Sequence, residues 1–192
     1  PSLEIIYLDD SGSVIAGPGV LDEEALADGT NPASNDEQSS GQIVIVSPDG
    51  VSALEIQDVN GNWINVTNGG VVQGQYGLLN VDATGNWTYT LTDNTLDHTD
   101  PNASGAADQV GESFSVRVFD GDGDVSPTVQ LSVVIYDDAP ELTQGEETTI
   151  SALVDEDETI DGNSDFDGDG NTVSGAAGTL TAPDMSSVEF IE

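Results

Sequence analysis

The amino-acid sequence predicts an all-β fold, a β-sandwich built from many short strands. Three observations support this prediction. Apolar and polar residues alternate along several runs, as they do in half-buried strands. Turns rich in Gly, Asn and Asp separate these runs. No amphipathic helix is visible, since the nearest candidate, Glu23–Ala27, is about one turn long before Asp28-Gly29. Short strands joined by such turns are typical of a β-sandwich.

The predicted strands follow one another along the whole chain. Ser113–Phe119 and Val129–Val133 alternate strictly, and Trp87–Leu91 alternates aromatic or aliphatic residues with threonine. Tyr76–Val81 precedes the last of these across a short Gly-containing turn, which predicts a β-hairpin. The remaining predicted strands are Leu3–Leu8, Gln42–Ser47, Ala53–Gln57, Trp63–Thr67, Thr148–Leu153, Gly178–Thr181 and Val188–Ile191. We expect Trp63 and Trp87 to lie in the core rather than on a ligand-binding surface.

The chain also repeats itself at a domain-sized spacing of about 130 residues. Leu3–Asp10 resembles Leu131–Asp138, and each copy is followed by a short polar segment. Two further matches, in the same order, join Leu21–Gly29 to Val154–Gly162 and Ser40–Asp49 to Ser174–Asp184. We therefore expect a tandem array, in which 1–138 form one repeat unit with a strand carried from the preceding unit. Residues 139–192 then begin the next repeat, docked as part of one enlarged β domain; the alternative is a poorly ordered tail.

The charge of the chain is extreme. There are 37 Asp and Glu residues against a single basic side chain, Arg117, and the formal net charge is −36 over 192 residues. Self-repulsion of this size opposes a compact fold. A high net charge with few hydrophobic residues is also a signature of disorder, but the strand patterns argue against a disordered chain. Nucleic acids and anionic membrane surfaces are excluded as partners because they require clustered Lys and Arg. There is no cysteine, no apolar stretch long enough to span a membrane, and no visible signal peptide.

Acidic loops suggest how the charge is compensated. Asp165, Asp167, Asp169 and Asn171 alternate with other residues in Asp165–Asn171, and this is the first half of an EF-hand pattern. Ala176 stands where an EF-hand has its bidentate glutamate, so the loop is not an EF-hand and must borrow other ligands. A solvated acidic turn is the alternative. We favour calcium, because three neighbouring carboxylates repel one another unless a cation lies between them.

Other acidic residues extend this prediction to several calcium ions. Asp120, Asp122 and Asp124 form a second loop between two predicted strands, and the pair Asp137-Asp138 ends the last strand before Pro140. Further candidate ligands, which we expect to chelate ions between consecutive domains, are Asp9, Asp10, Asp22, Glu23, Asp155 and Asp157. A flexible charged hinge is the alternative. Ligand sets made only of oxygen favour calcium or magnesium over zinc or copper, and calcium tolerates irregular loops better.

Little in the sequence indicates catalysis. The only histidine, His98, lies in the long polar segment Thr92–Gly111, where we expect it to be an exposed loop residue rather than part of a zinc site. No nucleophile set or phosphate-binding loop is visible, and carboxylate pairs carry no information in so acidic a chain. We therefore predict that the protein is not an enzyme. A long loop on a rigid sandwich is, however, a common place for a binding site.

Several segments together resemble the roughly 143-residue repeat of RTX-type giant adhesins that are secreted by type I systems. These segments are Leu21–Pro32, Tyr76–Val81 with Trp87–Leu91, Thr92–Thr95, Phe119–Asp124 and Asp137–Pro140. The resemblance covers about residues 20–140, and a new repeat begins after it. It implies an immunoglobulin-like, calcium-binding module held at the outer surface of a Gram-negative bacterium.

The resemblance also implies two alternative functions. The first is a ligand-binding module for cell adhesion and biofilm formation, which binds a peptide or protein, less readily a glycan, through calcium. The second is a purely structural extender that calcium makes rigid between neighbouring domains of the same long chain. The residues beyond the repeat, after Pro140, favour an enlarged ligand-binding module.

Overall fold

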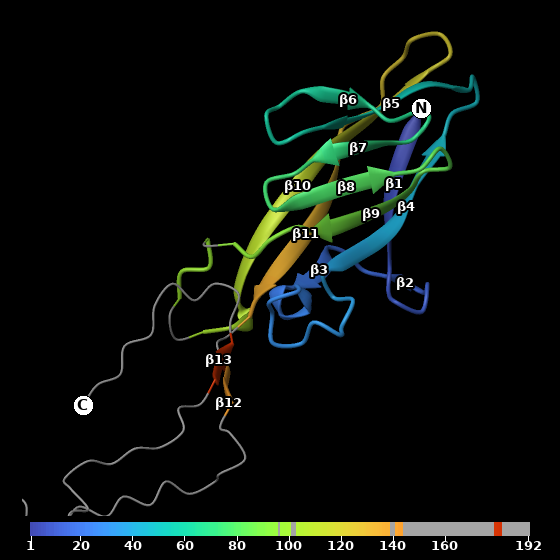
Figure 1. The fold of residues 1–192 in the computed structure, drawn as a ribbon. Coiled ribbons are helices and arrows are strands. Elements are labelled where there is room, and N and C mark those ends of the chain that lie inside the picture. Colours follow the sequence, from blue (N-terminus) through green and yellow to red (C-terminus); the bar gives the residue numbers. More distant parts are fainter. Residues whose placement is uncertain (96, 101–102, 139–140, 144–178, 182–192) are drawn as a thin grey trace, which may run out of the picture. The chain divides into compact units, whose positions relative to one another are not determined.

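The computed structural model describes residues 1–95, 97–100, 103–138, 141–143 and 179–181 (Figure 1). The chain divides into two compact units, and the boundary between them follows Pro140. In the second unit, β12 (Glu141–Thr143) pairs antiparallel with β13 (Thr179–Thr181). No helix in the described part of the chain is both long enough and apolar enough to cross a membrane.

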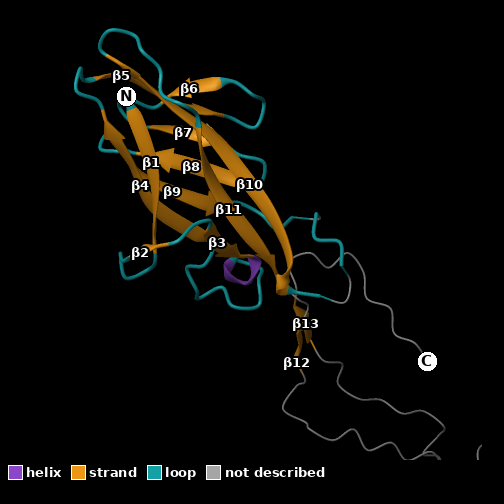
Figure 2. Ribbon diagram, turned by 180° about the vertical axis from the view of Figure 1, so that it is seen from behind, coloured by secondary structure: helices purple, strands orange, loops and turns teal. Residues whose placement is uncertain are grey.

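The first unit contains two sheets, and the larger has six strands (Figure 2). Its spatial order is β2-β1-β4-β9-β8-β7, and every pairing in it is antiparallel. The strands are β1 (Ser2–Leu8), β2 (Val14–Ile15), β4 (Gln38–Val46), β7 (Gly70–Gln73), β8 (Gly77–Val81) and β9 (Asn86–Leu91). The first strand is therefore an integral member of this sheet.

The second sheet has five strands in the order β3-β11-β10-β5-β6. Its strands are β3 (Gly19–Asp22), β5 (Val51–Gln57), β6 (Trp63–Asn65), β10 (Gly105–Asp120) and β11 (Val129–Asp137). The edge strand β3 runs parallel to β11. A single turn of 3-10 helix, η1 (Glu23–Ala25), follows β3 directly. As a result, the acidic residues that follow β3 lie beside the last residues of β11.

Alternating side chains of the two sheets meet in one core. Phe114 of β10 and Tyr89 of β9 are both buried, and their ring centroids lie 5.8 Å apart across the sandwich. Tyr7 of β1 packs edge-on against Trp87 at 5.5 Å, and its hydroxyl accepts a hydrogen bond from the backbone N–H of Ser132 in β11. The predicted all-β fold with two packed sheets is thus confirmed.

The two tryptophans have different places. Trp87 is in the core, as predicted, with 1% of its surface exposed. The prediction for Trp63 is wrong, because Trp63 is only half-buried. The guanidinium of Arg117 lies over its ring, with Cζ 3.8 Å from the ring centroid. The same guanidinium donates to Glu55 at 2.7 and 2.9 Å. The one basic side chain of the protein is therefore held by Trp63 and Glu55.

The predicted strands correspond closely to the observed ones, with additions at the margins. β2, β3, β7 and β12 were not predicted, and β10 begins at Gly105, inside the segment that we expected to be a loop. The predicted strand Gly178–Thr181 corresponds to β13. The predicted strands Thr148–Leu153 and Val188–Ile191 lie outside the described residues.

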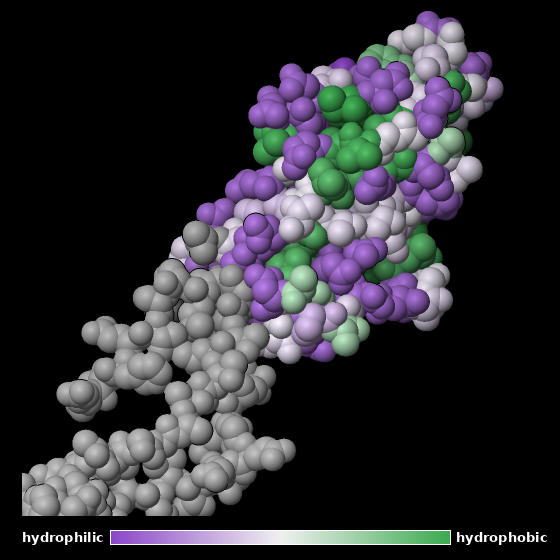
Figure 3. Space-filling view, viewed as in Figure 1, coloured by the Kyte–Doolittle hydropathy of each residue, from purple (hydrophilic) through white to green (hydrophobic). Residues whose placement is uncertain are grey.

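The surface of the first unit is mixed (Figure 3). On the face shown, apolar side chains gather over the upper part, and hydrophilic side chains surround them. Exposed apolar residues of the described chain include Val14, Val46 and Val71, each more than half exposed. Because the two sheets already enclose a continuous core, these valines are additional to it.

Candidate metal centres

Four hairpin turns of the sandwich share one hydrogen-bond pattern. Each begins with an aspartate, has glycine three residues later and ends one residue after that: Asp9–Ser13, Asp58–Asn62, Asp82–Asn86 and Asp120–Asp124. In each, the first and fifth residues pair through the backbone, and the glycine N–H donates to the carbonyl of the aspartate. The glycines have φ between 79° and 97°, which is typical of a three-residue hairpin loop with a glycine bulge.

In all four turns the first aspartate also accepts from the turn itself. The Oδ1 of Asp9 accepts from the N–H groups of Ser11 and Ser13, and the Oδ1 of Asp82 accepts from those of Thr84 and Asn86. Neutral side chains add further donors, since Ser11 Oγ lies 2.6 Å from Asp9 and Thr84 Oγ1 lies 2.7 Å from Asp82. Asp9 therefore stabilises its turn, and it is not among the described residues whose ligand atoms converge.

The fourth turn has carboxylates at its third and fifth positions, Asp122 and Asp124, where the other three turns have neutral side chains. Where the turns at Asp9 and Asp82 place a hydroxyl donor, the turn at Asp120 places another carboxylate, Asp122. The carboxylate of Asp49, from the turn between β4 and β5, converges on the same point, and ligand atoms of all three residues lie within 4.8 Å of one another. Gly121 permits this approach, because a Cβ there would lie 2.3 Å from the carbonyl oxygen of Asp49.

The protonation of this pair reflects the crowding. The pKa of Asp122 is raised above its usual value because its carboxyl shares a hydrogen bond with Asp120 and faces the charge of that residue. The pKa of Asp120 is lowered by the same hydrogen bond and by the donor N–H of Asp124. A divalent cation between the two carboxylates would replace the shared proton. Asp120 is buried, whereas Asp49, Asp122 and Asp124 are exposed to solvent.

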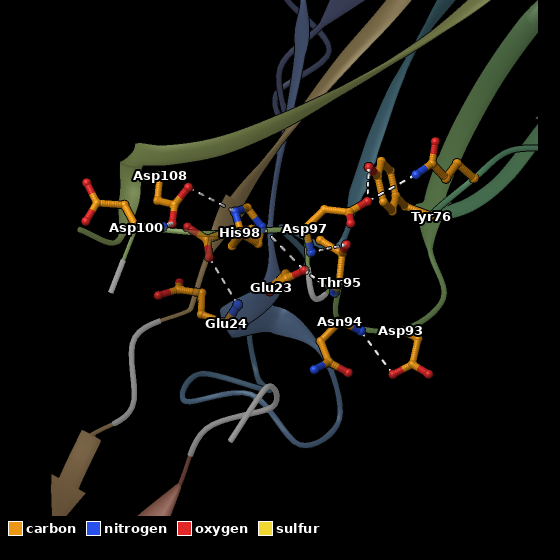
Figure 4. Close-up of polar contacts among 12 residues, drawn as sticks. Glu23, Glu24, Tyr76, Asp93, Asn94, Thr95, Asp97, His98, Asp100 and Asp108 are labelled. Carbon is orange, nitrogen blue, oxygen red and sulfur yellow. Dashed lines mark hydrogen bonds and ion pairs between the residues drawn. The ribbon is translucent and has the colours of Figure 1, made fainter. Parts of the chain in front are cut away.

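A second group of chemistry-bearing residues lies at the other end of β10, where ligand atoms of Glu23, His98 and Asp137 converge within 4.8 Å. Figure 4 shows two of them, Glu23 and His98, with their neighbours. Glu23 is fully buried and accepts a hydrogen bond of 2.6 Å from the N–H of Thr95. The His98 side chain is 2% exposed, so the prediction of an exposed loop residue is wrong. Its Nε2 lies 3.6 Å from Glu23, and its Nδ1 lies 3.7 Å from Asp108.

The loop that carries His98 is fastened by its neighbours. Asp97 accepts hydrogen bonds from the hydroxyl of Tyr76 at 2.7 Å and from the side-chain amide of Gln75 at 3.1 Å (Figure 4). Burial, and then the hydrogen bond to Asp97, raise the pKa of Tyr76 to about 12, so its hydroxyl stays a donor at physiological pH. These contacts hold the residue before His98 to the turn between β7 and β8.

The remaining predicted ligands of the first unit are divided among other roles. Asp22 accepts from the N–H of Glu24 and so caps η1, and burial together with the charges of Glu24, Asp138 and Asp36 raises its pKa. Asp138 is buried, and its two carboxylate oxygens accept from the hydroxyl and the N–H of Thr30. Asp10 is exposed. The predicted pairs therefore separate: Glu23 and Asp137 meet, whereas Asp22 and Asp138 have other hydrogen-bond partners.

Several predicted ligands belong to the part of the chain that is not described. These are Asp155, Asp157, Asp165, Asp167, Asp169 and Asn171. Conversely, Asp49, His98 and Asp108 were not predicted as site residues. The turn pattern shared with Asp9, Asp58 and Asp82 is a sequence signal that would have singled out the fourth turn. No local signal indicates Asp49, because it reaches the cluster from a different hairpin.

A groove of about 370 Å³ opens beside strands β2 and β3, each at the edge of its sheet. Its apolar lining includes Leu8, Ile15 and Val20, and its acidic lining includes Asp10 and Asp36. Ile15 and Val20 are each more than a third exposed. A groove with both kinds of lining suits a ligand that carries an apolar group and a polar one.

Comparison with protein-family models, with curated proteins and with solved structures finds no match.

Proposed function

We propose that this chain is a calcium-dependent, immunoglobulin-like module of a bacterial cell-surface adhesin that binds a peptide or protein ligand. The observation that carries the proposal is the convergence of Asp49, Asp120 and Asp122 in a turn whose counterparts use neutral donors. A site made only of carboxylates suits a hard divalent cation. Arg117, the only basic side chain, is bound to Glu55 and Trp63, so it does not compensate these acids, and the positive charge nearest to Asp120 is the amino terminus of Pro1 at 3.9 Å.

The working place of such a module is outside the cell. Extracellular calcium modules bind with Kd of about 10⁻⁴–10⁻³ M, and calcium is abundant enough there to occupy them. The net charge of −36 also agrees with a chain that meets its counter-ions after export. The resemblance to type I-secreted RTX adhesins of Gram-negative bacteria supports the same location. The proposal includes no enzymatic activity, no nucleic-acid partner and no membrane insertion.

The groove between the sheet edges is the proposed ligand site. Its carboxylates, Asp10 and Asp36, lie beside the apolar surface of Leu8 and Ile15. A calcium ion held there would keep open positions for a carboxylate or hydroxyl of the ligand, while the apolar residues receive a neighbouring side chain. A peptide satisfies both requirements more readily than a glycan, which lacks a large apolar group.

A purely mechanical spacer is the second candidate, and one observation favours it. Leu142 of β12 pairs with Leu180 of β13, just as Leu3 of β1 pairs with Ile45 of β4. Leu3 and Leu142 each follow a proline by two residues, and Ile45 and Leu180 each precede a Pro-Asp pair by three. Relative to β13, Leu142 thus has the place that Leu3 has relative to β4, although the sequence repeat of Leu3–Asp10 is Leu131–Asp138. A shared pairing of this kind is expected of a tandem array of extender domains.

Thermal unfolding with and without calcium tests the shared part of both candidates. In 10 mM calcium, which is about 10–100 times such a Kd, each site should stabilise the fold by about 1.4–2.7 kcal/mol, which is a rise in Tm of about 3–10 °C for a chain of this size. Scanning calorimetry of the protein in millimolar calcium and in excess chelator measures this difference. An unchanged Tm in chelator would rule out a calcium-dependent module.

A peptide array, probed in calcium and in chelator, then separates the two candidates. Calcium-dependent binding to particular peptides supports the ligand-binding module. The matched variant is Ile15→Asp, which adds charge to the exposed apolar lining of the groove without touching either converging cluster. Binding that survives this variant places the ligand elsewhere, and an array without calcium-dependent signals favours the spacer.

A further inference from the structure

The buried cluster beside β3 calls for a different ion from the one that the acidic turn suits. We propose that Glu23, His98 and Asp137 form a site for a divalent first-row transition metal ion, for which Zn²⁺ is the probe. An imidazole nitrogen is a ligand for zinc, iron, nickel or copper, whereas calcium is bound by oxygen. This site is independent of the calcium proposal, which rests on Asp49, Asp120 and Asp122.

The first observation is the state of His98. Its side chain is 98% buried, since 2% is exposed, and both ring nitrogens are inaccessible to water. Within the described part of the chain, neither nitrogen has a hydrogen bond, because the nearest carboxylate oxygens are 3.6 and 3.7 Å away. Hydrogen bonds of this kind have lengths of about 2.7–3.2 Å. A buried imidazole that points at carboxylates from beyond this distance leaves room for an ion.

The second observation is the separation itself. In a tetrahedral zinc site with ligands at about 2.0–2.2 Å, two ligand atoms lie about 3.4 Å apart. The 3.6 Å between His98 Nε2 and Glu23 Oε1 is close to this ligand-to-ligand distance. Asp137 completes the group, in which one ligand atom from each of the three residues lies within 4.8 Å of those of the other two. Three protein ligands leave a fourth position for water or a bound ligand, as in open zinc sites.

The third observation is the support around these ligands. The Nδ1 of His98 faces Asp108, and a metal-bound histidine characteristically directs its second nitrogen at a carboxylate. Asp108 in turn accepts from the N–H of Asp100 at 2.9 Å, and Glu23 accepts from the N–H of Thr95. At 3.7 Å the carboxylate of Asp108 makes no hydrogen bond with Nδ1, but it lies where it would accept one and hold the ring as a positioning group when Nε2 binds the ion.

Zinc titration of the whole protein in calcium-saturated buffer tests the proposal. Isothermal calorimetry should give one zinc site that millimolar calcium does not displace. His98→Asn should weaken zinc binding more than Asp108→Asn, for which we expect a loss of about 10–100-fold. Asp93→Asn is the matched control, because Asp93 is an exposed acid of the same loop outside the cluster, and its affinity for zinc should equal that of the wild type.

The single histidine permits a measurement that needs no variant. In a ¹⁵N-labelled protein, the ring nitrogens of His98 give one resolved set of resonances, and zinc should shift the Nε2 signal at one equivalent. An unshifted ring, or equal zinc affinity of wild type and His98→Asn, would overturn the proposal. His98 would then be a buried side chain that packs between Glu23 and Asp108. A calcium-dependent Tm that persists in that case would leave the proposed function intact.

Discussion

The two ends of β10 handle clustered acids in opposite ways. At its amino-terminal end, Glu23 is fully buried, and a histidine with an equally buried ring lies beside it. At its carboxyl-terminal end, Asp122 and Asp49 are exposed, and only Asp120 is buried. From Asp108 to Asp120 the strand spans roughly 40 Å at about 3.3 Å per residue, so each cluster must be neutralised separately.

The difference concerns what water can do. Exposed carboxylates at the turn are hydrated and screened, so their repulsion is moderate without any ion. A buried carboxylate such as Glu23 has no such help, and an uncompensated buried charge is strongly destabilising. The buried cluster must therefore include its own cation or proton, whereas the exposed turn only gains from one. We expect the buried end to affect folding and the exposed end to affect calcium response.

The largest effect should come from Glu23→Ala. This variant removes the acceptor of the buried Thr95 N–H and leaves His98 beside Asp108 without its other carboxylate. We expect a loss of about 1–3 kcal/mol, the usual cost of leaving a buried donor without its acceptor, and therefore a fall in Tm of about 2–12 °C. Thermal unfolding in saturating calcium without transition metals measures it.

The matched variant is Glu23→Gln, which keeps the shape and an oxygen that accepts from Thr95. Its Tm should lie between those of the wild type and Glu23→Ala, since the hydrogen bond survives and the charge does not. If both variants unfold at the wild-type temperature, the buried end does not determine stability, and the contrast with the exposed turn fails.

The sequence predicts much of the sheet framework and little of the buried cluster. Strands such as Ser113–Phe119 and Trp87–Leu91 are predictable because alternation is a local consequence of burying one face. β3 is missed because it is short and its pairing with β11 is distant in sequence and parallel. The burial of His98 depends on Thr95 contacting Glu23, 72 residues away, and on Asp97 contacting Tyr76. Periodicity carries no record of such contacts.

The acidic turn is a different case, because the pattern led to a ligand assignment that the geometry refines. Alternating aspartates at Asp120, Asp122 and Asp124 suggest a loop that curls around an ion. The first of them is instead the aspartate of a common hairpin turn, and Asp124 contributes a backbone N–H to it. Asp122 and Asp124 both replace neutral residues of the related turns, but only Asp122 converges with Asp49 and Asp120, so the test of calcium belongs at that position.

An intermediate effect is therefore expected for Asp122→Ser, and its sign should depend on calcium. In chelator, the serine hydroxyl can donate to Asp120 as Ser11 donates to Asp9, so the variant should be at least as stable as the wild type. In millimolar calcium it should be less stable, because a ligand is missing. Unfolding curves of both proteins in both buffers measure this effect: the Tm of the variant should equal or exceed that of the wild type in chelator and fall below it in calcium.

The control for Asp122→Ser is the reverse change in a related turn. Thr84→Asp replaces the donor to Asp82 with a second carboxylate, at a turn that belongs to neither converging cluster. It should destabilise the protein in chelator, and calcium should restore little. If calcium rescues Thr84→Asp as well as it stabilises the wild type, two adjacent acids are sufficient to bind it, and Asp49 has no part in the site.

The smallest effect should come from the charge of Asp82, which accepts hydrogen bonds from the neutral side chains of Thr84 and Asn86 in its own turn. Hydrogen bonds from Asn86 and Thr84 lower the pKa of Asp82 to about 2, below its usual value of 3.8. Because the folded protein favours the ionised form, this charge stabilises the fold above about pH 4, and the contribution is lost as the pH falls through about 2.

Asp82→Asn should thus unfold at a slightly lower urea concentration than the wild type at pH 7. The difference in stability between the two proteins should shrink steadily from pH 5 downward, because the wild type loses the contribution of this charge and the variant has none to lose. A gap that stays constant down to pH 3 would mean that shape, not charge, is what Asp82 contributes. The fourth turn would then differ from the other three only in its affinity for cations.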